Sequence, residues 1–433
     1  MPASSRPVSI GLRSYQVGFG DCFLLSFRYD AAGTKQRHVL IDCGSTGRPK
    51  YAPTLEQVAK DIRARCGGEG GKLHVVVATH RHADHISGFS GKAGEILTAL
   101  HPDVVLQPWT EDPDLAPDAR GPTALKARGR PRAFTRALAS MHEIAARSLV
   151  EIERMPARKT VRDQVRALGE VNLKNAEAVR TLSRTMTGRK VYAFHGKAPG
   201  LAQALPGVKV RVLGPPTLEQ SEAILEQRRE DPSEFWHLQA RAAAVSERRV
   251  PDAFRGWRTV LPGALPFETR WFLPRLDAVH SEQLLEIVRI LDEALNNTSL
   301  ILLFGVGKTR LLFPGDAQIE NWLYALEGAP DHKKGQKRLA GVHVYKVGHH
   351  GSLNATPKTL WRLFGKKGGP EAPERLRTFV STMAGKHGSH ARGTEVPRDK
   401  LIEALRQESA HFSTQELKKK ADIAKDFEIP VLG

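Results

Sequence analysis

The sequence predicts an α/β protein built from two similar halves that pack face to face. One order of elements occurs twice: strands that end in an aspartate, a helical stretch, and a strand that ends in histidine. The separation along the chain is also similar, from Asp42 to His80 and from Asp316 to His349. Because the aspartates and histidines of each half lie at the carboxyl ends of strands, we expect those of the first half to converge with those of the second.

The first half begins with apolar runs at residues 8–29 and 37–42, which are typical of strands, and the second run ends at Asp42. Residues 53–66 carry apolar side chains at helical spacing. A short run of β-favouring residues, 75–78, follows a glycine-rich turn. This run predicts a buried strand.

Four residues of the kind that bind metals follow that strand: His80, His82, Asp84 and His85. His80 and His82 are two residues apart in extended chain, so their imidazoles share one side and can hold one ion. Asp84 and His85 follow where the chain turns into a helix, and they can face a second ion. This pattern predicts a metal site, since histidines rarely crowd in this way by chance.

The second half has the same order. Its strands are expected at residues 299–304, 309–313 and 342–347, with a helical stretch at 319–326. The hairpin ends at Asp316, and the third strand ends at His349 and His350.

The remaining segments divide the chain into a core and insertions. We expect strands at 208–216 and 377–382, with mainly helical structure at 397–427. The predicted core therefore comprises residues 1–110, 190–216 and 296–433, with a helical C-terminal tail, and residues 111–189 and 217–295 form helical insertions over the cleft.

Composition favours an anionic partner. The 433 residues include 65 Lys and Arg against 47 Asp and Glu, a formal net charge of +18. Such a field attracts nucleic acid, nucleotides or other phosphorylated substrates, although a generally basic proteome would give the same bias. The basic residues between Arg120 and Arg136 either contact substrate phosphates or form a solvated face.

Other protein classes are excluded or disfavoured. No run of 18 apolar residues is present, and the first residues lack a secretory signal, so we expect no membrane span and a cytoplasmic location. Three cysteines argue against a disulfide framework. The absence of G-x-S-x-G, P-loop and Rossmann motifs disfavours acyl-serine, NTPase and dinucleotide chemistry.

The motifs resemble those of a known family. The sequence Thr79-His-Arg-His-Ala-Asp-His85 is similar to the signature of metallo-β-lactamase-fold hydrolases. Further motifs resemble, in the same order, the hydrolase domain of the DNA-uptake competence proteins (ComEC type) and their soluble relatives: Val17-Gly-Phe-Gly-Asp-Cys22, Leu40-Ile-Asp-Cys-Gly44, Asn296-Asn-Thr-Ser-Leu300, Leu312-Phe-Pro-Gly-Asp316 and Val347-Gly-His-His-Gly-Ser352. The resemblance covers roughly residues 8–110, 190–216 and 296–395.

The resemblance implies a four-layer αββα sandwich and a ligand set. His80 and His82 would bind the first ion, and Asp84 and His85 the second, with Asp316 bridging both. His349 is favoured to complete the second site. His350 would then support it or contact substrate, and Asp84, Asp316 and His350 are the expected catalytic residues.

Several further positions are open between a functional and an ordinary role. His195 is the best candidate for an additional ligand of the first ion, and a satisfied loop histidine is an equal alternative. Asp42 is expected to support the ligand loop by hydrogen bonds. The candidates for substrate contact, each otherwise an ordinary loop residue, are Asp21, Asn297, Ser352 and His390.

The expected activity is a metal-dependent hydrolase that uses two divalent ions to activate a water molecule for attack on a phosphodiester, as a nuclease or phosphodiesterase does. Zinc is the default metal for these nitrogen and oxygen ligands, and manganese fits nearly as well. One alternative is hydrolysis of a carboxylic ester, lactone or amide on the same centre. Another is a non-catalytic binding protein that holds a protein partner through the helical insertions.

Overall fold

The protein is described by a computed structural model that covers residues 6–114, 121, 150–154, 158–159, 161–163, 165, 175–221, 296–352, 356–386 and 395–433. These residues form two mixed β-sheets with helices, so the predicted α/β class is confirmed. Most of the two predicted insertions, including the basic stretch from Arg120 to Arg136, lies outside the described residues.

The first sheet has the strand order β13-β1-β2-β3-β4-β5-β6. Its strands are β1 Ser9–Tyr15, β2 Cys22–Arg28, β3 Gln36–Cys43, β4 Val75–Val77, β5 Val104–Pro108, β6 Arg189–Ala193 and β13 Ala424–Pro430. Pairing is antiparallel from β13 to β3 and parallel from β3 to β6. Because β3 and β4 are parallel, their carboxyl ends lie at the same end of the sheet.

The second sheet has the order β12-β11-β10-β9-β8-β7. Its strands are β7 Lys209–Gly214, β8 Ile301–Val306, β9 Thr309–Phe313, β10 Val344–Lys346, β11 Arg377–Val380 and β12 Ala410–Ser413. Antiparallel pairing from β7 to β9 again gives way to parallel pairing from β9 to β12. The twofold pattern expected from the sequence is therefore present in the strand order.

A hydrophobic core lies between the two sheets. It joins residues such as Phe23 and Phe27 of the first sheet to Phe304 and Phe313 of the second. The rings of Phe23 and Phe313 meet edge to face with centroids 5.8 Å apart. Burial of this many aromatic and aliphatic side chains is the main force that holds the sheets together.

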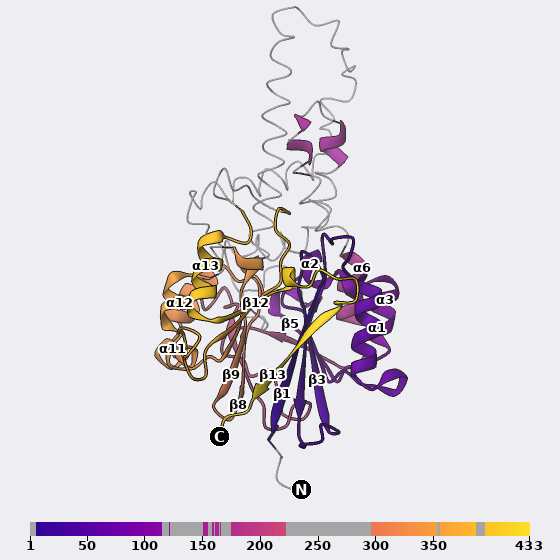
Figure 1. The fold of residues 1–433 in the computed structure, drawn as a ribbon. Helices are drawn as coiled ribbons and strands as arrows, with labels where there is room; N and C mark the ends of the chain where they lie inside the picture. The colour runs from indigo at the N-terminus through magenta and orange to yellow at the C-terminus, as the bar shows by residue number, and fades with distance from the viewer. Residues whose placement is uncertain are drawn as a thin grey trace, which may run out of the picture.

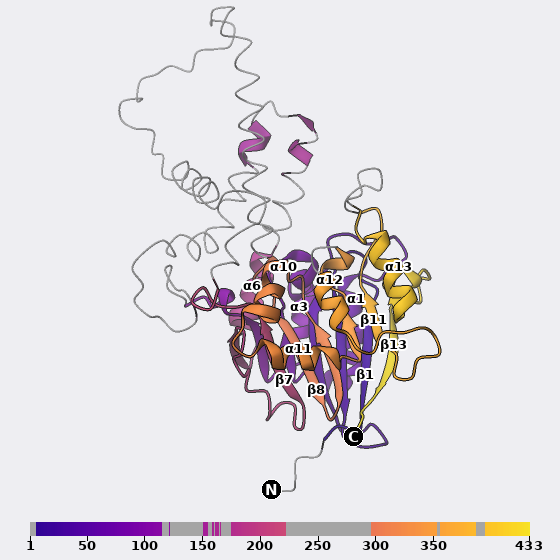
Figure 2. The ribbon, with the colours of Figure 1, turned by 90° about the vertical axis from the view of Figure 1, so that its left-hand side faces the viewer.

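Helices cover the outer face of each sheet, on opposite sides of the molecule (Figures 1 and 2). On the first sheet, α1 Leu55–Arg65, α3 Gly91–Thr98 and α6 Ala176–Arg180 contribute to a second hydrophobic cluster. On the second sheet, α10 Ile319–Leu323, α11 His332–Ala340, α12 Lys358–Leu363 and α13 Asp399–Glu408 contribute to a third. In α1 the buried positions Val58, Ala59 and Ile62 follow the predicted helical spacing.

The predicted helical tail at residues 397–427 is wrong beyond α13. The chain after that helix forms β12 in the second sheet and β13 in the first, and β13 pairs with β1. Phe427 packs against Phe412 and Phe379, with ring centroids 5.0 Å and 4.8 Å apart. Such tertiary contacts override a local preference that the lysine-rich sequence gives only weakly.

The apolar run predicted as strand at residues 8–29 forms two strands, β1 and β2, which are separated by a glycine-containing loop at 16–21.

Within the described ranges, no helix has the length and apolar character needed to cross a membrane.

Candidate metal centre

The polar loops of both halves meet at one end of the sheets. Asp84 and His85 lie on α2 Ala83–Ile86, which follows β4, while Asp316 follows β9 and His350 follows β10. In Figure 1 this helix lies at the end of the sheets opposite the C-terminus. One ligand atom from each of these four residues lies within 4.8 Å of the others, and all four side chains are buried. Two imidazoles and two carboxylates converge in this way on a single point.

Both imidazoles are held so that Nε2 faces the carboxylates. His85 Nδ1 donates to Asp42 Oδ2 at 2.8 Å, and its Nε2 lies 3.1 Å from Asp316 Oδ2. His350 Nδ1 donates to the carbonyl oxygen of Ser381 at 2.9 Å, and its Nε2 lies 2.8 Å from Asp84 Oδ2. A histidine held at Nδ1 by an acceptor presents the other nitrogen to a metal.

Asp42 supports the ligand loop as expected. Besides its bond to His85, it accepts hydrogen bonds from the backbone N–H and the hydroxyl of Thr79, each at 2.7 Å. Thr79 is the residue before His80, so the carboxylate of one βα unit fixes the start of the next loop. The backbone φ of Asp42 is 55°, a left-handed value that is uncommon in a non-glycine residue. The hydrogen bonds of its side chain to Thr79 and His85 help to hold this conformation.

A glycine allows α2 to approach the loop that follows β3. A Cβ on Gly44 would lie 2.5 Å from both Ala83 O and His85 N, so any side chain there would push the ligand helix away. On the neighbouring loop, the ring of Phe19 packs against the imidazole of His350 with centroids 4.2 Å apart. These contacts close the centre from the side of the first sheet.

The centre carries an excess of buried negative charge. Asp21 and Asp42 lie beside His85 in a second group of possible ligands, so four carboxylates cluster with Asp84 and Asp316 included. Lys346 supplies a buried ammonium group, which pairs with Asp21 and lies 3.7 Å from Asp316 Oδ1. Burial of unbalanced charge is costly, so this cluster favours a bound cation.

The same charges perturb the side-chain pKa values. Burial by itself lowers the pKa of His85, but Asp316, Asp42 and Asp84 raise it well above its ordinary value. For the carboxyl group of Asp316, burial by itself raises the pKa, but the positive charges of His85, His349 and His350 hold it well below its ordinary value. Positive charge is therefore strongly favoured beside these carboxylates, and the donor set fits a divalent metal ion.

His80 and His82 form a pair beside this group. His80 Nε2 lies 3.1 Å from His82 Nδ1, and the ring centroids of His80 and His85 are 4.1 Å apart. Burial, then His85 and His82, lowers the pKa of His80 well below its ordinary value, so its imidazole is neutral as a ligand must be. Among the described residues, neither belongs to a group of three possible ligands.

Of the two adjacent histidines, His350 and not the favoured His349 belongs to the four-residue group. The His350 side chain is fully buried within the four-residue group. The His349 side chain is 29% exposed, and its Nε2 lies 4.0 Å from Asp316 Oδ2. Both residues have a left-handed backbone, with φ of 41° and 53°, which turns successive side chains in directions that strand periodicity does not predict.

The other candidate residues lie in different surroundings. His195 has a partner at each ring nitrogen: Nδ1 donates to Leu213 O at 2.8 Å, and Nε2 lies 3.5 Å from Asp331 Oδ1. Asn297 is buried, and its Nδ2 donates to Glu320 Oε2 at 3.2 Å. Ser352 is partly exposed next to the histidine pair, and His390 lies outside the described residues.

Asp21 was a candidate for substrate contact, and the structure buries it. Its side chain is 1% exposed and lies behind the ligands, 3.6 Å from His85 Nδ1 and 3.9 Å from His350 Nδ1. Its partner Lys346 was missed by the sequence analysis. The available signal was a lysine within the apolar run Val342 to Val347, where a solvated residue is out of place.

Neither a scan against models of protein families nor a search of curated proteins finds a match to this chain. The function is therefore inferred from the geometry of the centre and from the motifs themselves.

Proposed function

We propose that the protein is a metal-dependent hydrolase of the metallo-β-lactamase fold that cleaves phosphodiester bonds. The observation that carries the proposal is the buried group of Asp84, His85, Asp316 and His350, drawn from both sheets. Two sheets packed face to face with outer helices support assignment to the four-layer αββα sandwich, as do the motifs that resemble the competence-protein hydrolases.

Two ions are proposed, with different affinities. Asp84, His85, Asp316 and His350 offer a complete ligand set for one firmly held ion. His80 and His82 offer two imidazoles beside His85 for a second ion, which we expect to be held more weakly because this set is smaller. When bound, the ions supply Lewis acidity, which lowers the pKa of water and polarises a substrate oxygen.

The residues of the chain supply orientation. Asp42 and the Ser381 carbonyl group fix the Nδ1 protons of His85 and His350, which keeps both Nε2 atoms directed at the centre. Lys346 neutralises Asp21 and lies near Asp316, so the carboxylates remain close together without full mutual repulsion. Phe19 covers His350 and excludes solvent on that side.

Phosphodiesters are favoured over carboxylic esters by charge. A formal net charge of +18 draws a polyanionic substrate toward the protein and speeds its encounter. A neutral ester or lactone gains nothing from this field.

The test is hydrolysis by the full chain supplied with Mn²⁺ or Zn²⁺, assayed on bis-(p-nitrophenyl) phosphate and single-stranded DNA beside p-nitrophenyl acetate and a simple lactone. We expect turnover of the phosphodiesters. His350→Asn should lower that turnover at least about 100-fold, since removal of one ligand costs roughly 3 kcal/mol of transition-state stabilisation.

His349→Asn is the matched control, because it alters the neighbouring histidine by the same change and should cost less than about tenfold. Faster hydrolysis of the ester or lactone would replace the phosphodiester assignment. No turnover on any of the four substrates would contradict a hydrolase, and a larger loss in His349→Asn would reverse the choice of ligand.

A further inference from the structure

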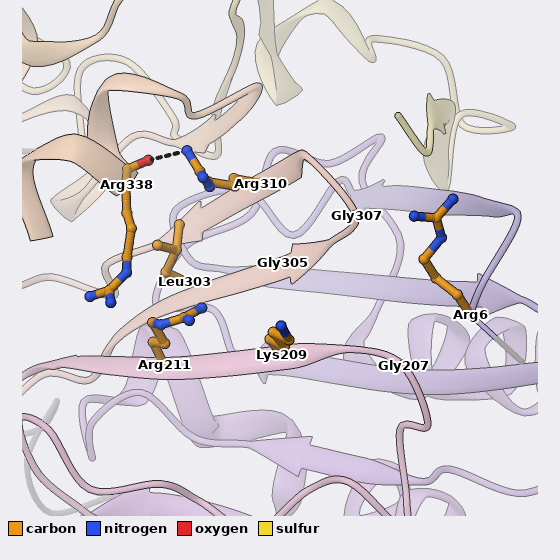
Figure 3. A pocket seen from close by; sticks show the side chains of 9 residues that line it. All are labelled: Arg6, Gly207, Lys209, Arg211, Leu303, Gly305, Gly307, Arg310 and Arg338. Atoms are coloured by element: carbon orange, nitrogen blue, oxygen red, sulfur yellow. Dashed lines mark hydrogen bonds between the residues drawn. The ribbon is translucent and has the colours of Figure 1, made fainter. Parts of the chain in front are cut away.

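A basic cavity of about 370 Å³ lies on the second sheet, away from the metal centre. Figure 3 shows its cationic side chains, which come from β7, β9, the end of α11 and the N-terminal segment. They are Arg6, Lys209, Arg211, Arg310 and Arg338. None of the described residues that line the cavity is acidic.

The strand register sets this arrangement. Lys209 of β7 is paired with Gly305 of β8, which in turn is paired with Arg310 of β9. Two cations therefore flank a glycine on one row of the sheet, and the glycine leaves the space between them unfilled. A Cβ on Gly305 would have ordinary van der Waals contacts, the nearest at 3.6 Å from Lys209 O, so the gap is not required by steric hindrance.

The cations are held in place with little neutralisation. Arg310 donates to the carbonyl oxygen of Arg338 at 3.2 Å, as the dashed line in Figure 3 marks. Arg338 in turn lies 3.4 Å from a carboxylate oxygen of Asp331, a side chain that is itself half exposed. Burial, followed by the positive charges of Arg338 and Arg310, lowers the pKa of Arg211. Like charges are thus brought together here at a cost that a bound anion would offset.

We propose that this cavity binds a compact, multiply charged phosphate anion, such as a linear chain of two or three phosphate groups. Guanidinium groups match phosphate oxygens with paired hydrogen bonds, and four of the five cations are arginines. Among the described lining residues, Leu303 is the only large apolar one, and none carries an aromatic ring for a base to stack on. The ligand is therefore recognised by its phosphates alone.

This site is distinct from the metal centre. Arg310 lies near the start of β9, whereas Asp316 follows the end of that strand, so at 3.3 Å per residue the strand alone separates them by about 10 Å. The β8–β9 turn lies beside the C-terminal residues, where Lys308 N–H donates to Leu432 O at 3.1 Å. A ligand here is bound toward the opposite end of the strands from the metal centre and is not the substrate of the proposed hydrolase.

The test is isothermal titration calorimetry of the full chain with inorganic tripolyphosphate, in buffer that contains a chelator so that the metal centre does not contribute. We expect saturable binding near one equivalent. Gly305→Leu keeps every charge but fills the gap between Lys209 and Arg310, and it should weaken binding at least about tenfold. Arg211→Gln should weaken it to a similar extent without altering the packing of the sheet.

The control is the double variant Lys358→Ala/Lys400→Ala, which removes two exposed cations from α12 and α13 and should bind as the unaltered chain does. Equal affinity in Gly305→Leu and the unaltered chain would overturn the proposal, because binding would then follow overall charge. The absence of detectable binding at millimolar tripolyphosphate would also overturn it. So would an Arg211→Gln variant that binds tripolyphosphate normally but binds a single-stranded oligonucleotide more weakly.

Discussion

Asp316→Asn is expected to lower phosphodiester hydrolysis by about 10³-fold or more. The Asp316 carboxylate belongs to the buried four-residue group and lies 3.1 Å from His85 Nε2, and it is the ligand proposed to serve both ions. Loss of its charge removes about 4 kcal/mol or more of electrostatic stabilisation from the reaction, which corresponds to three orders of magnitude. The measurement is kcat/KM on bis-(p-nitrophenyl) phosphate with saturating Mn²⁺.

The amide keeps the shape of the side chain, and its oxygen can still accept the hydrogen bond from the His349 N–H. The metal-free variant should still fold, but it should unfold at a lower temperature than the unaltered chain, since the carboxylate charge that the surrounding positive groups stabilise has been removed. Glu371→Gln, the same chemical change on an exposed loop residue, should have no effect on rate. A rate within tenfold of normal in Asp316→Asn would remove this residue from the centre.

Lys346→Met should destabilise the fold by about 3–5 kcal/mol. Lys346 is 2% exposed and supplies positive charge next to Asp21 and Asp316, so its removal leaves the buried carboxylates with less positive charge to balance them. Urea denaturation of the chelator-treated protein measures this loss as a lower midpoint at unchanged slope.

The double variant Lys346→Met/Asp21→Asn should recover part of the lost stability, since it removes the carboxylate that the lysine neutralises. A change in the free energy of unfolding of less than about 1 kcal/mol in Lys346→Met would show that Lys346 is not needed to balance the buried acids.

Local patterns were sufficient to predict the repeated elements. The apolar runs that precede Asp42, His80, Asp316 and His350 each form a strand in the structure. The prediction succeeds there because these strands are largely buried on both faces and consist mainly of β-favouring residues. The spacing of polar residues after these strands predicted that Asp84, His85 and Asp316 lie close together, as they do in the structure.

The errors have a common physical origin, which is that contacts distant in sequence decided the outcome. β13 forms because β1 offers an open edge and Phe379 offers a ring to pack on, and neither is visible in the local sequence around Phe427. The choice between His349 and His350 depends on two consecutive left-handed residues. The depth of Asp21 depends on Lys346, which is more than 300 residues later in the chain.

The central claim is that Asp84, His85, Asp316 and His350 hold a metal ion, and metal analysis tests it most directly. The full chain, loaded with Zn²⁺ or Mn²⁺ and then dialysed, should retain at least one equivalent of metal by inductively coupled plasma mass spectrometry. His85→Ala/His350→Ala should retain less than a tenth of that amount while keeping a cooperative unfolding transition. Equal retention by the double variant and the unaltered chain, or no metal in either, would contradict the claim.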